Sequence, residues 1–388
     1  MTGNKLKALT AAGQAIWLDY LHQDILRSGE LMRLIADDGI TGLTSNPSIF
    51  EKAIGGGDSY DARIRALLAA APDAQPPELY EQIAIADIQA AADQFLPTYD
   101  RLGGKDGYVS LEVSPTLAND TAGTVAEARR LWAAVDRPNL MIKVPGTPAG
   151  TPAIRQLISE GVNVNVTLLF ALEAYLAVAE AHIAGLEACK ASGRSIAGVH
   201  GVASFFVSRI DTAIDKCIDE KLKTADAATA ARLSAVRGQV AIANAKVAYQ
   251  RYLGLVTSPR WHALADAGAA PQRLLWASTG TKDPAYSDVL YVETLIGPDT
   301  INTMPPKTLD AFREHGQVAA TLVRDPDQSA RTLAEAEALG LDLKGVTDAL
   351  IDDGVDAFAK AFKDLLAAVG EKRTRIAGDR STANPAHA

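Results

Sequence analysis

Eight short apolar segments alternate along the chain with longer segments whose apolar residues recur at helical spacing. Short apolar runs bounded by Gly, Pro or polar residues are typical of buried parallel strands. A strand followed by a helix, repeated about eight times, predicts an α/β fold of the (β/α)₈ (TIM) barrel type, with helical insertions and C-terminal helices. The predicted strands span about residues 15–20, 40–44, 108–113, 140–146, 162–167, 196–203, 274–278 and 300–304.

No linker divides the chain into independent halves. We predict a single domain over residues 1–388, with the barrel at about 14–316, a C-terminal helical appendage at about 328–370 and a disordered polar tail at about 375–388. The appendage carries an apolar stripe at helical spacing, formed by Val355, Phe358, Phe362, Leu365 and Val369. The alternative is a doubly wound sheet, but no G-x-G-x-x-G motif opens a helix after an early strand.

The acidic composition limits the kinds of partner. The 388 residues include 47 Asp and Glu against 38 Lys and Arg, a formal net charge of −9. A general nucleic-acid or membrane-surface binder needs a basic face, so we expect neither partner. The N-terminal residues lack an apolar signal segment, and no apolar run is long enough to span a bilayer. We therefore expect a cytoplasmic protein, and whether it is a monomer or a homodimer is open.

One lysine lies within the apolar segment at 140–146. Lys143 stands between Ile142 and Val144, where its side chain cannot easily reach water. Burying an unpaired ammonium is costly, so such a position favours a neutral amine, the nucleophile that Schiff-base formation with a carbonyl requires. The alternative is a structural lysine at a strand end that reaches water or pairs with a carboxylate.

Polar residues also fall at the ends of the other predicted strands. In a (β/α)₈ barrel the carboxyl ends of the strands surround the active site. Each residue has a structural alternative: Asp19 could cap a helix, and Glu112 could neutralise Lys143. Buried polar groups without partners cost stability, so their convergence on one rim favours function. The residues are Asp19, Thr44, Asn46, Glu112, Lys143, Asn165, Thr167, Ser204 and Arg209, with Ser278 and Lys282 after the seventh strand.

The segment from Ser278 to Lys282 has the parts of a phosphate site. It provides hydroxyl groups, a glycine that permits close backbone approach, and a cation, and barrels often bind phosphate after strands seven and eight. Arg209 could add a bidentate contact. The alternative is a glycine turn before a solvated lysine. The six histidines show no metal-ligand spacing, so we expect neither a metal nor another cofactor.

Five motifs make the sequence resemble the transaldolases, in particular their longer bacterial type. They lie between about residues 17 and 304, and the T-S-N-P-S and N-V-T-L-L-F segments are the most specific. The motifs are Thr44-Ser45-Asn46-Pro47-Ser48, Ser110-Leu111-Glu112-Val113, Ile142-Lys143-Val144-Pro145, Gly161-Val162-Asn163-Val164-Asn165-Val166-Thr167-Leu168-Leu169-Phe170 and Ser204-Phe205-Phe206-Val207-Ser208-Arg209.

The resemblance implies a metal-free, class I aldol transfer in the non-oxidative pentose phosphate pathway. A ketose phosphate, sedoheptulose 7-phosphate or fructose 6-phosphate, would give its dihydroxyacetone unit to an aldose phosphate, erythrose 4-phosphate or glyceraldehyde 3-phosphate. Lys143 would form the Schiff base, Asp19 would take the proton of the C4 hydroxyl, and Glu112 would move protons through a water near Thr167. The substrate-binding residues implied are Thr44, Asn46, Asn165, Ser204, Phe206, Arg209, Ser278 and Lys282, with the last three on the phosphate.

One position departs from the family pattern. Many shorter transaldolases have Ser-x-Arg after the seventh strand, whereas this chain has Gly280, and the nearest cation is Lys282. Lysine holds phosphate less directionally than arginine. Two other functions stay open: a Schiff-base aldolase that releases the three-carbon unit to water, and a sugar-phosphate sensor without catalysis. Asp19 and Glu112 beside Lys143 argue against the sensor, which needs no proton transfer.

Overall fold

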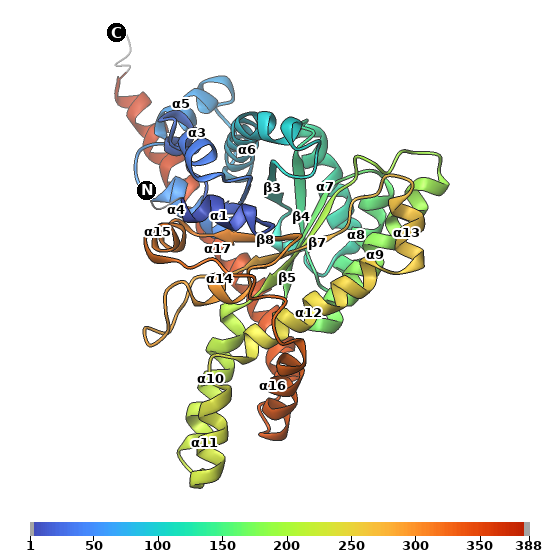
Figure 1. The fold of residues 1–388 in the computed structure, drawn as a ribbon. Helices are drawn as coiled ribbons and strands as arrows, with labels where there is room; N and C mark the ends of the chain where they lie inside the picture. Colours follow the sequence, from blue (N-terminus) through green and yellow to red (C-terminus); the bar gives the residue numbers. More distant parts are fainter. Residues whose placement is uncertain (1–3, 384–388) are drawn as a thin grey trace, which may run out of the picture.

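The computed structural model describes residues 4–383, and within them eight parallel strands form a closed barrel. The strands pair in chain order, and β1 pairs with β8 to close the sheet (Figure 1). This arrangement confirms the predicted (β/α)₈ fold. The strands are β1 (Gln14–Asp19), β2 (Gly42–Thr44), β3 (Tyr108–Glu112), β4 (Leu140–Pro145), β5 (Val164–Leu169), β6 (Gly201–Phe206), β7 (Arg273–Ala277) and β8 (Thr300–Met304).

Two strands lie further along the chain than the sequence predicts. The fifth, predicted at 162–167, is β5 at Val164–Leu169, and the sixth, predicted at about 196–203, is β6 at Gly201–Phe206. Every residue of both strands is buried. Because the strands are covered on both faces, the apolar pattern continues past their ends and does not mark the boundary.

Helices follow the strands and surround the barrel (Figure 1). In α8, the residues Ile154, Leu157 and Ile158 recur at helical spacing and are buried, as the sequence predicts. No helix within residues 4–383 combines the length and the apolar character needed to cross a membrane. The helices are α1 (Lys5–Ala11), α2 (Gln23–Arg27), α3 (Glu30–Arg33), η1 (Leu34–Asp38), α4 (Pro47–Gly55), α5 (Asp61–Ala70), α6 (Pro76–Arg101), η2 (Pro115–Leu117), α7 (Thr121–Val135), α8 (Gly150–Ser159), α9 (Leu172–Ala191), α10 (Ser208–Leu222), α11 (Ala227–Val236), α12 (Val240–Val256), α13 (Pro259–Ala265), α14 (Leu290–Thr294), α15 (Pro306–His315), α16 (Pro326–Ala338) and α17 (Leu343–Ala383).

A tryptophan and a glycine fill the barrel between β1 and β2. Trp17 is fully buried and pairs in register with Gly42. A Cβ at position 42 would lie 2.5 Å from the indole ring, so only glycine leaves room for it. Trp17 Nε1 donates to Asp106 Oδ1 at 2.8 Å, which satisfies the buried indole N–H. Packing of this kind makes the barrel a filled core, and a functional site lies beyond the strand ends.

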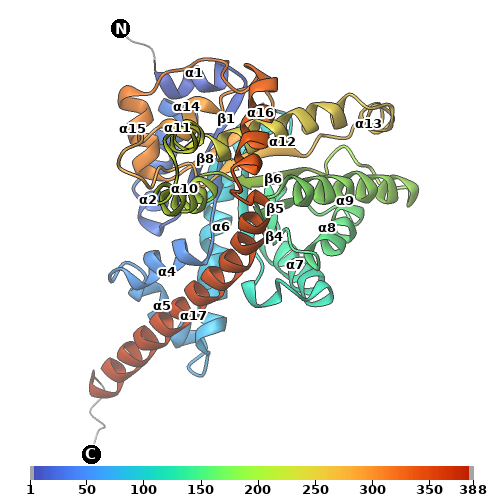
Figure 2. The ribbon, with the colours of Figure 1, turned by 90° about the horizontal axis from the view of Figure 1, so that it is seen from below.

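The C-terminal helix α17 crosses the barrel near β5 rather than standing apart from it. It contacts α4, α5, α6, α10 and β5. Figure 2 shows it as a long diagonal segment in front of the strands β4 and β5. Phe358, Leu365 and Val369 of the predicted apolar stripe are buried, and they hold the helix against the rest of the molecule.

The structure differs from the predicted disordered tail at residues 375–388, because α17 continues to Ala383. Ile376 is fully buried. Lys372 Nζ lies 2.9 Å from Asp61 Oδ1, and Arg375 Nη2 lies 2.5 Å from Asp61 Oδ2. Asp61, the partner of both cations, lies in a distant part of the sequence, so the local polar composition did not indicate that this segment is helical. Residues 384–388 lie outside the described residues.

Candidate active site

A cavity of about 400 Å³ lies at the carboxyl ends of the strands. All the predicted site residues except Glu112 and Asn165 line it. The two exceptions are buried next to residues of the cavity wall. The predicted residues that line the cavity are Asp19, Thr44, Asn46, Lys143, Thr167, Ser204, Phe206, Arg209, Ser278 and Lys282.

Lys143 and Glu112 form a buried charged pair. They are neighbours in the register of β4 and β3, so their side chains leave the sheet on the same side. Lys143 Nζ lies 3.3 Å from Glu112 Oε2, and the two side chains are 5% and 3% exposed. Nζ also donates to the carbonyl of Ser45 at 3.2 Å. Separating the two groups would leave each charge buried without an opposite charge, which is unfavourable. The amine is therefore held beside a proton acceptor.

Asp19 ends β1 and is held by the neighbouring strand. Thr44 Oγ1 donates to Asp19 Oδ1 at 2.7 Å. The same Thr44 oxygen lies 2.7 Å from Thr303 Oγ1 of β8. Since the Thr44 proton is used on Asp19, the Thr303 hydroxyl donates to Thr44. Residues from three adjacent strands therefore fix the carboxylate at the cavity wall.

Burial raises the pKa of both carboxyl groups, Asp19 and Glu112. Loss of hydration is the largest cause in each, and the positive charge of Lys143 opposes it. The hydrogen bond from Thr44 also lowers the pKa of Asp19. A carboxylate with a raised pKa is a stronger base, which suits it to remove protons from a bound molecule.

Asn165 is fully buried and orients Ser204 from within the barrel. Ser204 Oγ donates to Asn165 Oδ1 at 2.7 Å, and Asn165 Nδ2 donates to Ser110 Oγ at 3.0 Å. Two other buried oxygens, Thr167 Oγ1 and Glu112 Oε1, have no hydrogen-bond partner among the described residues. Other buried atoms without partners occur elsewhere in the described residues, but these two belong to residues at the site of Lys143, which favours a functional role.

The positive charge near Asp19 includes a half-buried arginine. The Arg209 guanidinium lies over the ring of Phe206, 5.4 Å from the ring centroid. Burial lowers the pKa of Arg209, as expected for a cation partly removed from water. Ser278 has a φ of 55°, and its Oγ lies 2.9 Å from Ser208 Oγ. This contact joins the start of α10, which carries Arg209, to the loop after β7, which carries the exposed Lys282. Both cations line the same cavity.

The predicted site residues do not include several residues of the cavity wall, among them Lys52, Thr303 and Phe358. Lys52 had a usable signal, because Asn46 caps α4 by accepting from the Ile49 N–H at 3.0 Å. A helix that begins there places Lys52 on the face of Ser48, four residues earlier. Thr303 is the last polar residue of the strand predicted at 300–304, as Thr44 is of the strand predicted at 40–44. Phe358 had no signal beyond its place in the apolar stripe.

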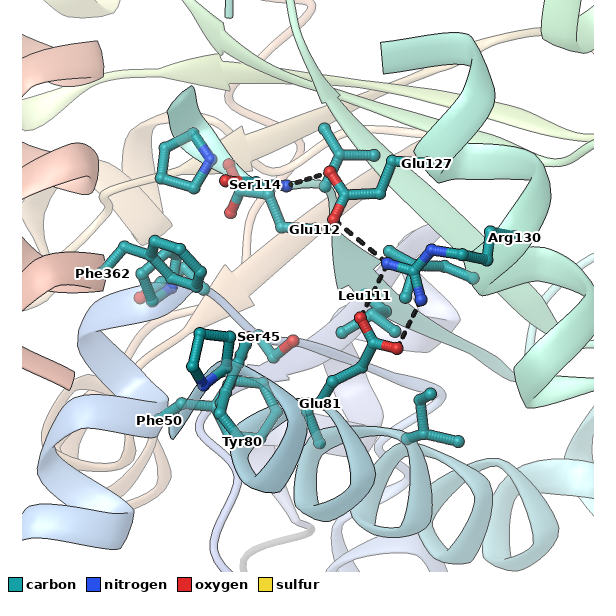
Figure 3. A pocket seen from close by; sticks show the side chains of 18 residues that line it. Ser45, Phe50, Tyr80, Glu81, Leu111, Glu112, Ser114, Glu127, Arg130 and Phe362 are labelled. Atoms are coloured by element: carbon teal, nitrogen blue, oxygen red, sulfur yellow. Dashed lines mark hydrogen bonds and ion pairs between the residues drawn. The ribbon is translucent and has the colours of Figure 1, made fainter. Parts of the chain in front are cut away.

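A second cavity, of about 260 Å³, adjoins the first at Asn46, which lines both. Glu112 lines the second cavity only. Figure 3 shows aromatic rings on one side of it and a chain of ion pairs on the other. The rings and the paired charges belong to Phe50, Tyr80, Phe362, Glu81, Arg130 and Glu127. The charges at this cavity are satisfied by one another, whereas the carboxylate of Glu112 is paired with Lys143 at the first cavity.

No group of three or more His, Cys, Asp or Glu side chains in the described part of the chain is placed to hold a metal ion. The chemical groups at the site are instead a buried amine, two carboxyls with raised pKa values, and cations in the same cavity. This is the arrangement of enzymes that attack the carbonyl group of an anionic substrate with a lysine. Residues 16–369 match the Transaldolase/Fructose-6-phosphate aldolase family, and the chain belongs to that family.

Relatives of similar length cover almost the whole chain. A transaldolase of Trichodesmium erythraeum is 49% identical over 380 residues, which cover 97% of this chain and 99% of the relative. A transaldolase of Thermobifida fusca is 48% identical, with 95% and 98% covered, and one of Thiobacillus denitrificans is 48% identical, with 95% and 100% covered. These similarities confirm the resemblance drawn from the five motifs.

Proposed function

We propose that this chain is a transaldolase that moves a dihydroxyacetone unit from a ketose phosphate to an aldose phosphate through a Schiff base on Lys143. The observation that carries the proposal is the position of Lys143 Nζ. It is buried, lies 3.3 Å from a carboxylate with a raised pKa, and opens on a cavity that holds further cations. An amine so placed can lose a proton to its neighbour and attack a carbonyl carbon.

Glu112 serves the steps that make and break the bond to nitrogen. It accepts the proton of the Lys143 ammonium as the amine adds to the C2 carbonyl of the donor. The carbinolamine then loses water to form the iminium, and the reverse steps release the product. Glu112 and the hydroxyl of Thr167 exchange protons with that water, a role supported by their buried oxygens without protein partners.

Asp19 serves the step that breaks the carbon–carbon bond. It removes the proton of the C4 hydroxyl, the C3–C4 bond breaks, and its electron pair moves to the iminium to form an enamine. The raised pKa of Asp19 makes it a suitable base, and Thr44 holds the carboxylate in place. The aldose phosphate leaves, and an acceptor aldehyde is attacked by the enamine in the reverse sense.

The remaining residues hold the sugar and its phosphate. Asn46, Ser204 and Asn165 are placed to bind hydroxyl groups of the dihydroxyacetone unit, Asn165 through its hold on Ser204. Phe206 lines the wall below the guanidinium. Arg209, Ser278 and Lys282 bind the phosphate, and Lys52 adds a second lysine on the same cavity. Arginine supplies the directional contact in this set.

The proposed reaction also bears on where the protein works and on its assembly. Its substrates are phosphorylated sugars, which are charged and stay in the compartment where they are made. We therefore place the protein in the cytoplasm, as a monomer or homodimer, with no nucleic-acid or membrane partner. Gel filtration and cell fractionation test these points.

An acceptor-dependence assay tests the proposed reaction. With fructose 6-phosphate as donor, addition of erythrose 4-phosphate should give sedoheptulose 7-phosphate and glyceraldehyde 3-phosphate in equal amounts. An aldolase that releases dihydroxyacetone to water would turn over at a rate unaffected by the acceptor. A sensor would bind the sugar phosphate and give no product.

A further inference from the structure

We propose that Phe358, supplied by the C-terminal helix α17, is a positioning residue that shields the Lys143 enamine from solvent and so favours transfer over release of the three-carbon unit. The inference rests on the proposed transaldolase function and deepens it. It concerns a residue outside the strand-end set, on a helix that follows the barrel in sequence.

Phe358 lies directly beside the reacting nitrogen. Its ring centroid is 5.6 Å from Lys143 Nζ, and the residue is 6% exposed and lines the larger cavity. Nζ has two polar contacts, with Glu112 at 3.3 Å and with the Ser45 carbonyl at 3.2 Å. The aromatic face therefore covers the amine on the side of α17, where solvent would otherwise reach it.

The approach of α17 to the barrel is built into the chain one turn earlier. A Cβ at Gly354 would lie 2.8 Å from Leu168 Cδ2, so the glycine lets the helix lie against Leu168 without displacing that side chain. Leu168 itself has a φ of 61°, an uncommon conformation for a leucine, within an irregular part of β5. Gly354 and Phe358 are four residues apart and share one helix face, so the contact that seats the helix also places the ring.

The same helix is anchored at two further points, Phe362 beside the second cavity and Lys372 further along the helix. Phe362 packs edge-to-face against Tyr80 at 5.6 Å, and Lys372 Nζ lies 2.9 Å from Asp61 Oδ1. Both side chains of the ion pair are 10% exposed. Because partners from α5 and α6 hold α17 along its length, the Phe358 ring has a fixed place over the amine.

Shielding by the Phe358 ring affects which of two reactions the enamine undergoes. After donor cleavage, Lys143 carries the three-carbon unit as an enamine. In transfer, the enamine carbon forms a bond to the aldehyde carbon of the acceptor, whose oxygen takes a proton. In release, the enamine carbon takes a proton from solvent, the iminium adds water, and the C–N bond breaks. Release consumes one water in total and yields dihydroxyacetone and the free amine, so covering the enamine favours transfer.

The test measures the ratio of free dihydroxyacetone to transferred product, with fructose 6-phosphate as donor and erythrose 4-phosphate as acceptor. Phe358→Ala should raise this ratio on the order of tenfold, because the ring no longer keeps water away from the reactive enamine. Phe358→Leu, which keeps an apolar cover, should stay within about twofold of the unmodified protein. If Phe358→Leu releases as much dihydroxyacetone as Phe358→Ala, shielding by an apolar side chain is not the cause.

A matched control separates the ring from the helix. Val369 is fully buried on α17, away from the cavity, so Val369→Ala loosens the packing of the helix without uncovering Lys143. Its ratio should equal that of the unmodified protein, and an increase as large as that of Phe358→Ala would overturn the proposal. Failure of the unmodified protein to transfer would reject the proposed function instead, whereas normal transfer with an unchanged Phe358→Ala ratio rejects only this inference.

Discussion

The two working regions of the cavity are built in different ways. The region around Lys143 is built mainly of strand residues: Glu112 is buried and paired with Lys143 across the strand register, and the half-buried Asp19 is held by a hydrogen bond from Thr44. The cationic region takes Arg209 from the start of α10, Lys282 from a loop and Lys52 from α4, and both lysines are exposed. Bond making needs atoms fixed closely, whereas attraction of a phosphate acts over a longer distance and tolerates variation.

This difference predicts two kinds of mutational effect. Changes near Lys143 should lower kcat, because they remove groups that act on the bonds that form and break. Changes among the cations should raise KM for phosphorylated sugars, with a dependence on salt, because exposed charges are screened.

Lys143→Ala should lower kcat for transfer by about 10⁴-fold or more, since Lys143 is buried beside a carboxylate whereas the other two lysines of the cavity, Lys52 and Lys282, are exposed. Steady-state transfer from fructose 6-phosphate to erythrose 4-phosphate measures it. Lys52→Ala, a lysine on the same cavity, is the matched control and should keep a nearly normal kcat. A Lys143→Ala protein that keeps a tenth of the normal kcat would contradict the assigned role.

Asp19→Asn and Glu112→Gln should each lower kcat by about 10²–10³-fold, but at different steps. Asp19→Asn should still form the imine with the donor and fail to cleave it, so borohydride trapping persists without release of the aldose phosphate. Glu112→Gln should slow trapping itself. Rapid-quench trapping alongside product formation distinguishes them, and identical step profiles would count against the division of roles.

Arg209→Ala should raise KM for fructose 6-phosphate by about 100-fold, the loss expected for a charge-assisted pair of hydrogen bonds. Lys282→Ala and Lys52→Ala should raise it only a few-fold, because exposed lysines are screened by solvent. Unphosphorylated fructose serves as the control substrate, and its KM should be nearly unchanged in all three variants. A larger effect of Lys282→Ala than of Arg209→Ala would reverse the order assigned to the cations.

The smallest effect concerns pH. Transfer needs Asp19 as a carboxylate, and burial raises its pKa. As the pH is lowered, kcat should therefore fall at a pH above 3.8, the ordinary pKa of an aspartate. Thr44 stabilises the charged form, so Thr44→Val should raise the pKa of Asp19 and move the acid limb of kcat to higher pH. Thr303→Val, which leaves the Thr44–Asp19 bond intact, should move it less; a limb that moves to lower pH would be inconsistent with this geometry.

The sequence predicted the region around Lys143 and two of the three cations, Arg209 and Lys282, but not Lys52 or the position of Phe358 over the amine. The carboxyl ends of parallel strands converge in a barrel, so the strand count alone brings Asp19, Lys143 and Thr167 to one rim. Lys52 requires the phase of α4, which depends on the Asn46 cap.

The contribution of α17 was beyond the sequence pattern for a different reason. The contact of Phe358 with Lys143 depends on how a long helix crosses the barrel, with Gly354 of that helix lying against Leu168. The helical state of residues 375–383 depends likewise on Asp61, a partner from α5. Contacts between distant parts of the chain leave no periodic signal in either segment.

The most direct test is to locate the covalent intermediate. The protein is incubated with fructose 6-phosphate, reduced with borohydride, digested and analysed by mass spectrometry. In the unmodified protein, the structure predicts a reduced three-carbon or ketose adduct on the peptide that contains Lys143. In Asp19→Asn, that peptide should carry only the uncleaved ketose adduct. An adduct on Lys52, Lys282 or any other lysine, with Lys143 unmodified, would contradict the account.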